Sequence, residues 1–105
     1  MERENPIPKR LKEARQRAKI TQKELGIRIG MEESSASGRM NHYEKGRHTP
    51  DVSVLQRMAK ELNVPLSYFF CESDSLAELN RIMGKMSEEE RNALIKQLSS
   101  KEPNT

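Results

Sequence analysis

Helix-boundary signals follow one another closely along this chain and leave room only for short helices. Thr21 and Glu24 have the spacing of a capping box, in which two residues satisfy each other's backbone N–H groups at a helix start. Ile20 and Leu25 stand at the positions of the hydrophobic staple that accompanies such a start. Gly46 is placed as the glycine that follows a helix C-terminus. Helices this short are marginal alone, so they must pack against one another.

The apolar spacing between these boundaries predicts a compact all-α domain of five helices. We expect them over residues 8–19, 22–30, from Ser34 or Ser35 to Lys45, after the N-cap Asp51, and within NVPLSYFF. The fifth helix is expected to insert Leu66, Phe69 and Phe70 as a lid on the core. Gly26, inside the second helix, costs about 1 kcal/mol relative to alanine, which is tolerable where another helix approaches closely.

The character of the chain changes after Cys71. A capping box formed by Ser87 and Glu90 opens a further helix, and a helical extension is predicted over residues 74–99, followed by a frayed tail over 100–105. Two apolar stripes mark the extension: Leu76, Leu79, Ile82 and Met83 on its first helix, and Leu94, Ile95 and Leu98 on its second. Because each stripe needs a surface to bury it, we expect the extension to form a dimer contact. The alternative is packing on residues 7–70.

Charge is divided unevenly between the two parts of the chain. Residues 1–70 contain 14 Lys and Arg against 9 Asp and Glu, whereas residues 71–105 contain 5 against 7. A basic domain favours a polyanionic partner such as nucleic acid, although a solvated charged surface explains the same balance. Only a third of the residues are apolar, which suits a small core and excludes a large ligand cavity.

Signals for membranes and secretion are missing from the sequence. It has no run of about 18 apolar residues, and MERENPIPKR has no apolar h-region. Cys71 is alone, so it cannot form an internal disulfide. We therefore expect a cytoplasmic protein with no membrane partner.

Residues 30–51, GMEESSASGRMNHYEKGRHTPD, combine two features that rarely occur together. Ala36, Met40 and Tyr43 recur at the spacing of a buried helix face. The other face carries Ser, Asn, Arg and His, which are small or hydrogen-bonding side chains that suit an approach to base edges in the DNA major groove. An ordinary surface helix with a serine-rich start is the alternative.

Three segments, TQKELGIRIGM, NHYEKGRHTP and LQRMAKELNVPLSYFF, resemble the phage-repressor (Cro-type, Xre) helix-turn-helix family of transcriptional regulators. The resemblance covers about residues 7–70 and is specific in the combination of its segments. It implies a five-helix lambda-repressor-like DNA-binding domain, followed here by the short helical extension, with the third helix in the major groove of double-stranded DNA.

The resemblance also implies roles for individual residues. Gln22 matches a position that contacts a phosphate and braces the recognition helix, and Lys45 and Arg47 match phosphate-contacting positions. Arg15 and Glu44 match a pair that ties the first helix to the third. The family's base-facing positions fall on Ser37, Gly38, Asn41 and His42, with Arg39 between them.

One departure from the family lies before the third helix. Fourteen residues lead from Gly30 to Glu44, where the family commonly has ten. The four extra residues are about one helical turn. Either the helix starts a turn early, which brings Ser34 and Ser35 toward the DNA, or the preceding turn is longer.

These observations predict a sequence-specific DNA-binding transcriptional regulator, a repressor that occupies an operator as a dimer. An antitoxin that binds its toxin and regulates its own operon through the same domain is the main alternative, and a controller of a restriction–modification operon is a third. No cofactor is expected. Enzymatic activity is disfavoured because no phosphate loop or nucleophile–base signature occurs. His42 and His48 lack the further ligands of a metal site.

Overall fold

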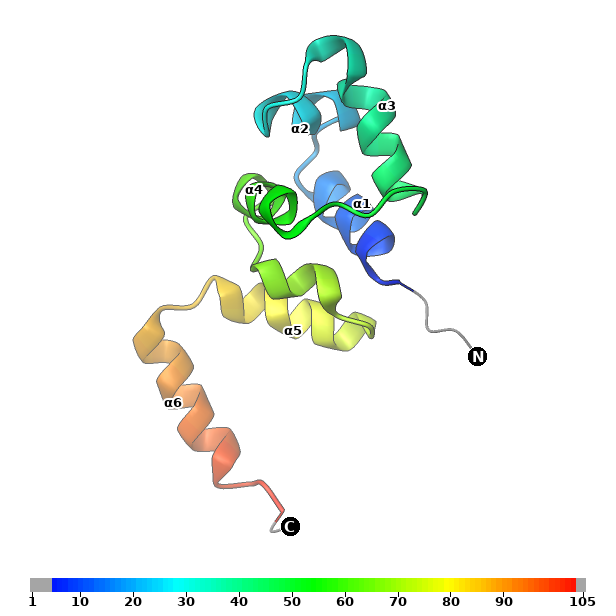
Figure 1. Cartoon of the computed structure of the whole chain (residues 1–105). Coiled ribbons are helices and arrows are strands. Elements are labelled where there is room, and N and C mark those ends of the chain that lie inside the picture. Colours follow the sequence, from blue (N-terminus) through cyan, green and yellow to red (C-terminus); the bar gives the residue numbers. More distant parts are fainter. Residues whose placement is uncertain (1–4, 104–105) are drawn as a thin grey trace.

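Helices make up the whole regular structure of residues 5–103, the part of the chain described by the computed structural model (Figure 1). They are α1 (Ile7–Arg17), α2 (Gln22–Arg28), α3 (Glu33–Glu44), α4 (Val52–Leu62), the 3-10 helix η1 (Leu66–Phe70), α5 (Asp74–Gly84) and α6 (Glu88–Ser99). The predicted all-α fold with five helices and a helical extension is confirmed. Residues 100–103 are not helical, and the remainder of the predicted tail lies outside the described residues.

The helix starts follow the predicted capping chemistry. Thr21 Oγ1 accepts the backbone N–H of Glu24 at 3.0 Å, and Glu24 Oε1 accepts the backbone N–H of Thr21 at 3.2 Å. The capping box of Ser87 and Glu90 is also complete. Asp51 caps α4, and the backbone N–H of Val54 holds the pKa of this carboxyl below its ordinary value. Local side-chain chemistry therefore sets these boundaries.

Two helices end earlier than their apolar spacing indicates. Helix α1 stops at Arg17, before Lys19 turns into the left-handed region with φ 59°, and α2 stops at Arg28, before Gly30 does so with φ 101°. A left-handed residue ends the hydrogen-bond ladder of a helix, and glycine adopts it without steric cost. The predicted ends were two residues too late at each helix.

The core lies where α1 to α4 and η1 meet. Its apolar side chains come from every one of these elements, and α5 adds one more: Leu11, Leu25, Ile29, Met40, Leu55, Met58, Leu62, Phe69 and Ala77. The predicted lid is only partly correct. Phe69 is fully buried and Leu66 is partly buried, but 49% of Phe70 is exposed, and Tyr68 is buried in its place. In a 3-10 helix residues three positions apart lie on the same face, so Leu66 and Phe69 face the core together, whereas Phe70, four positions after Leu66, is rotated about 120° away from them.

Helices α2 and α3 lie side by side at one end of the fold (Figure 1), in close contact at Gly26. A Cβ atom built on Gly26 would lie 2.7 Å from Ala36 Cβ and 3.1 Å from Ala36 Cα. The close approach expected at this glycine is therefore present. Gly38, in the middle of α3, has open space on the same test, with nothing within 4 Å.

Helix α5 is attached to the domain by a buried arginine that sequence reasoning did not identify. The Arg10 side chain is 1% exposed, and its guanidinium donates to the carbonyls of Cys71 at 2.8 Å and Glu72 at 3.3 Å. It also pairs with Glu13 and with Asp74, each at 3.0 Å. Residues 61 to 64 positions apart are thereby joined, so α5 is part of the folded unit.

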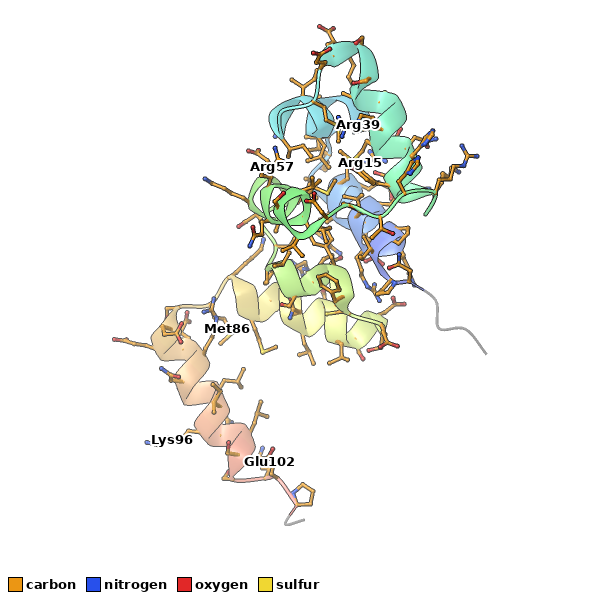
Figure 2. The ribbon with its side chains drawn as sticks, viewed as in Figure 1. Arg15, Arg39, Arg57, Met86, Lys96 and Glu102 are labelled. Atoms are coloured by element: carbon orange, nitrogen blue, oxygen red, sulfur yellow. The ribbon has the colours of Figure 1, made fainter. Side chains whose placement is uncertain are left out.

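Helix α6 projects away from this unit (Figure 1). None of its residues is buried. Its first turn is tied to the end of α5, because the Arg91 guanidinium donates to the carbonyl oxygens of Met83 at 2.8 Å and Gly84 at 3.2 Å. Figure 2 shows Met86 at this junction and Lys96 further along α6, away from the domain.

Alanine substitutions at the two helical glycines are expected to have opposite effects. Gly26→Ala should lower the free energy of unfolding by about 1–3 kcal/mol, because Ala36 cannot move away from the new methyl group without shifting α3. Gly38→Ala should raise it by about 0.5–1 kcal/mol, because alanine favours the helix and meets no neighbour. Urea unfolding of both variants tests the packing, and equal effects at the two positions would contradict it.

Candidate nucleic-acid interface

The turn before α3 is short, and the extra residues of this chain belong to the helix. Only residues 29–32 separate α2 from α3, and α3 begins at Glu33 with Glu32 as its N-cap. Of the two alternatives left open by the sequence, the early helix start is therefore the one observed. Ser34 and Ser35 consequently lie within the first turn of α3.

The inner face of α3 follows the predicted spacing. Ala36 and Met40 are fully buried, and Tyr43 is partly buried against the core. The residues predicted to contact DNA are accessible to solvent, some of them exposed and the others partly buried. Exposed are Ser37, Gly38, Arg39, Lys45 and Arg47. Partly buried are Gln22, Ser35, Asn41 and His42.

A buried ion pair fixes the C-terminal end of α3 to α1. The Glu44 side chain is 3% exposed and that of Arg15 is 13% exposed. Arg15 donates to both carboxylate oxygens of Glu44, through Nε to Oε2 and through Nη2 to Oε1 at 3.0 Å. Its Nη1 also donates to the carbonyl of Ile20 at 2.9 Å. Figure 2 shows the labelled Arg15 where α1 and α3 meet.

Gln22 connects the start of α2 to the same anchor. Its Nε2 donates to Glu44 Oε1 at 3.1 Å and to Asn41 Oδ1 at 3.3 Å. The bracing contact that the resemblance implied for Gln22 is therefore present. Three helices meet at one carboxylate, and the rotation of α3 about its axis is set by α1 and α2 together.

The opposite flank of α3 borders an open hollow of about 690 Å³. It is lined by residues of α3 and of the segment after it: Ser35, Gly38, Arg39, His42, Tyr43, His48 and Thr49. The rings of His42 and His48 stack with centroids 5.1 Å apart and planes 8° from parallel. Gly46 adopts φ 76°, which turns the chain back after α3 as its predicted position required.

His48 and Lys23 belong to this region although sequence reasoning gave neither a role in it. The turn at Gly46 brings His48 next to His42. The glycine predicts a turn, but it does not predict which side chain after the turn stacks on His42. Lys23 on α2 pairs with Glu33 on α3 at 3.1 Å, and both side chains are largely exposed. The sequence does not show which residues of the two helices face each other, so this ion pair could not be predicted from it.

Between residues 5 and 103, no set of three or more His, Cys, Asp or Glu side chains is grouped so that it could hold a metal ion. Over the same residues, no helix combines the length and apolarity needed to cross a membrane.

This geometry, a short turn between α2 and α3 with a polar outer face on α3, defines a helix-turn-helix protein. The helix-turn-helix family profile HTH_3 matches residues 11–69. The crystal structure of the transcriptional regulator BswR is similar over 90% of this chain and 93% of its own, with 40% sequence identity and a TM-score of 0.84. The chain therefore belongs to the Xre/Cro-like helix-turn-helix family of DNA-binding transcriptional regulators.

A second relative matches over a shorter region. The vegetative-specific protein H7 of Dictyostelium discoideum is 40% identical over 63 residues, which are 59% of this chain and 57% of that protein. This chain thus spans little more than half the length of that relative. The matched length is close to that of the helix-turn-helix region.

Loss of either partner of the Arg15–Glu44 pair is expected to lower the free energy of unfolding by about 3–5 kcal/mol, because it leaves an uncompensated buried charge. Arg15→Met and Glu44→Gln, alone and combined, form a double-mutant cycle measured by urea unfolding. The double variant should lose much less than the sum of the single losses. A coupling free energy near zero would show that the pair does not join α1 to α3.

Proposed function

We propose that this protein is a sequence-specific repressor that acts by occupying an operator as a dimer. The observation that carries the proposal is the division of α3 into a buried apolar face and an accessible polar one, held in place at Glu44. A helix with this division fits the major groove, which admits one α-helix and displays a distinct pattern of donors and acceptors for each base pair. An operator occupied in this way is closed to polymerase or to an activator.

Binding to DNA would involve two kinds of contact, to phosphates and to base edges. Lys45 and Arg47 follow α3, are exposed, and belong to the basic part of the chain, so we assign them to phosphates. The outer face of α3 would read bases: Ser37, Gly38, Asn41 and His42, with Arg39 and Ser35 beside them. Phosphate contacts supply most of the affinity, and base contacts choose the site.

Substitutions of the two kinds should be distinguishable in a binding assay. Lys45→Gln and Arg47→Gln should weaken binding to all duplexes alike, each reducing the slope of log K against log salt by about 1. His42→Ala should cost about 1–3 kcal/mol on the selected operator and relax its sequence preference. Competition binding at several salt concentrations measures both quantities. A His42→Ala variant that keeps full discrimination, with a changed salt slope, would reverse the assignment.

The dimer is proposed from the exposed apolar face of the extension. On α5, Leu76, Leu79 and Ile82 are 57%, 52% and 46% exposed, and on α6, Ile95 and Leu98 are 59% and 54% exposed. Soluble monomers rarely expose so many large apolar side chains on adjacent elements. A second copy of the chain is the occupant we favour, because a two-fold operator with half-sites about one turn apart needs two domains.

Charge also favours this arrangement. Basic residues outnumber acidic ones by 14 to 9 over residues 1–70, whereas acidic residues outnumber basic ones by 7 to 5 over residues 71–105. A dimer joined through the acidic extension would leave the basic domains free for DNA. Because Asp74 and Ala77 hold α5 to the domain, removing all residues after Cys71 would also damage the core. Charges placed on α6 are therefore the cleaner test.

The variant Ile95→Lys/Leu98→Lys is expected to be a folded monomer, because Ile95 and Leu98 are exposed within their own chain and charges at these positions would oppose contact with a second copy. Gln97→Lys, an exposed polar position on the same helix, is the matched control and should remain a dimer. Sedimentation equilibrium of the three proteins decides the matter, with thermal unfolding as a check on folding. A wild-type chain that is monomeric at high micromolar concentration would contradict the dimer and reopen the antitoxin alternative.

A further inference from the structure

Asn41 lies on the outer flank of α3 nearest to α2, where its amide meets Gln22. An asparagine amide has one acceptor end and one donor end, and the two ends recognise opposite features of a base. Which end faces outward therefore decides what Asn41 can read. The surrounding hydrogen bonds determine this without reference to the DNA.

The first constraint is the Glu44 carboxylate. It is buried and held by the Arg15 guanidinium, so its oxygens accept hydrogen bonds and donate none. The Gln22 amide group that lies 3.1 Å from Glu44 Oε1 must consequently be the NH2 group. The oxygen of Gln22 at that position would face a carboxylate oxygen with no hydrogen between them.

The second constraint passes from Gln22 to Asn41. The same Gln22 nitrogen lies 3.3 Å from the Asn41 amide and has a second hydrogen to donate, so the Asn41 atom there must be the acceptor Oδ1. The donor Nδ2 is then the end of the amide directed away from Gln22. Each of these two hydrogen bonds allows only one orientation of its amide, so the acceptor character of the Glu44 carboxylate determines the orientation of the Asn41 amide.

We infer that Glu44, through Gln22, locks the Asn41 amide with its NH2 group toward the DNA, so that Asn41 selects a hydrogen-bond acceptor on the base edge. The inference rests on the proposed function, since it takes α3 as the base-reading helix. Guanine presents two acceptors in the major groove, and thymine presents O4. Cytosine presents only the N4 amino donor, so it is the base that this amide disfavours most.

Two substitutions distinguish the role of Gln22, which fixes the orientation of the Asn41 amide, from the role of Asn41, which contacts the base. Asn41→Asp keeps an oxygen for Gln22 to donate to, but it replaces the outward NH2 group by a second oxygen. The preference at the contacted position should then change from an acceptor base to cytosine or adenine, which present amino donors. Gln22→Leu removes the hydrogen bond that orients the Asn41 amide and leaves Asn41 itself unchanged, so the amide can rotate to present either its donor or its acceptor to the base.

The experiment is selection from a randomised duplex library by the wild-type chain, Asn41→Ala, Asn41→Asp and Gln22→Leu, with Gln56→Leu, the same change at an exposed position of α4, as the control. Asn41→Ala identifies the contacted base pair. At that position we expect discrimination against cytosine to fall on the order of tenfold in Gln22→Leu, to invert in Asn41→Asp, and to stay unchanged in Gln56→Leu. Thermal unfolding confirms that each variant is folded.

Each outcome has a definite meaning. If Asn41→Ala weakens all sequences alike, Asn41 contacts a phosphate and the inference is wrong. If Gln22→Leu keeps the wild-type preference at the Asn41 position, the amide is not locked and the inference is wrong. If the wild-type chain enriches no sequence at all, the failure lies with the proposed function, because no base is then being read.

Discussion

The buried carboxylate of Glu44 is the interaction on which the arrangement of the helix-turn-helix depends. A charged group in a site that is 3% exposed is stable only when it is paired and hydrogen-bonded. Its partners come from two other helices, Arg15 on α1 and Gln22 on α2. The need to satisfy one carboxylate therefore sets the positions of three helices relative to one another.

The position of this anchor explains how α3 accommodates extra residues. The additional turn is at the N-terminal end of α3, next to Glu33, whereas Glu44 is its last residue. The close contact of Gly26 with Ala36 keeps α2 and α3 in register between the two ends. The C-terminal half of α3, with Asn41 and its neighbours, thus keeps its relation to α1 and α2 while the helix lengthens at the far end.

Features with a local cause were predictable from the sequence. Each depends on residues only a few positions away: the capping box of Thr21, the turn at Gly46 and the burial of Ala36. The Arg10 network was not predictable, because it joins residues more than sixty positions apart and no periodic pattern marks it. The exposure of Phe70 was missed because η1 is a 3-10 helix with a different repeat.

The candidate site shows the same division between local and tertiary information. Its face could be predicted, since the apolar spacing of α3 determines which residues point outward. The hydrogen bond of Gln22 to Asn41 and the stacking of His42 on His48 required the packed structure. Such contacts depend on the angle between helices, which residue spacing within one helix does not determine.

The proposed function requires that α3 lie in the major groove. Dimethyl sulfate protection on a selected duplex tests it most directly, because this reagent methylates guanine N7 in the major groove and adenine N3 in the minor groove. We expect protection of guanine N7 in two half-sites about one helical turn apart, with adenine N3 in the same half-sites still reactive. Protection of adenine N3 alone would place the protein in the minor groove and contradict the proposed position of α3.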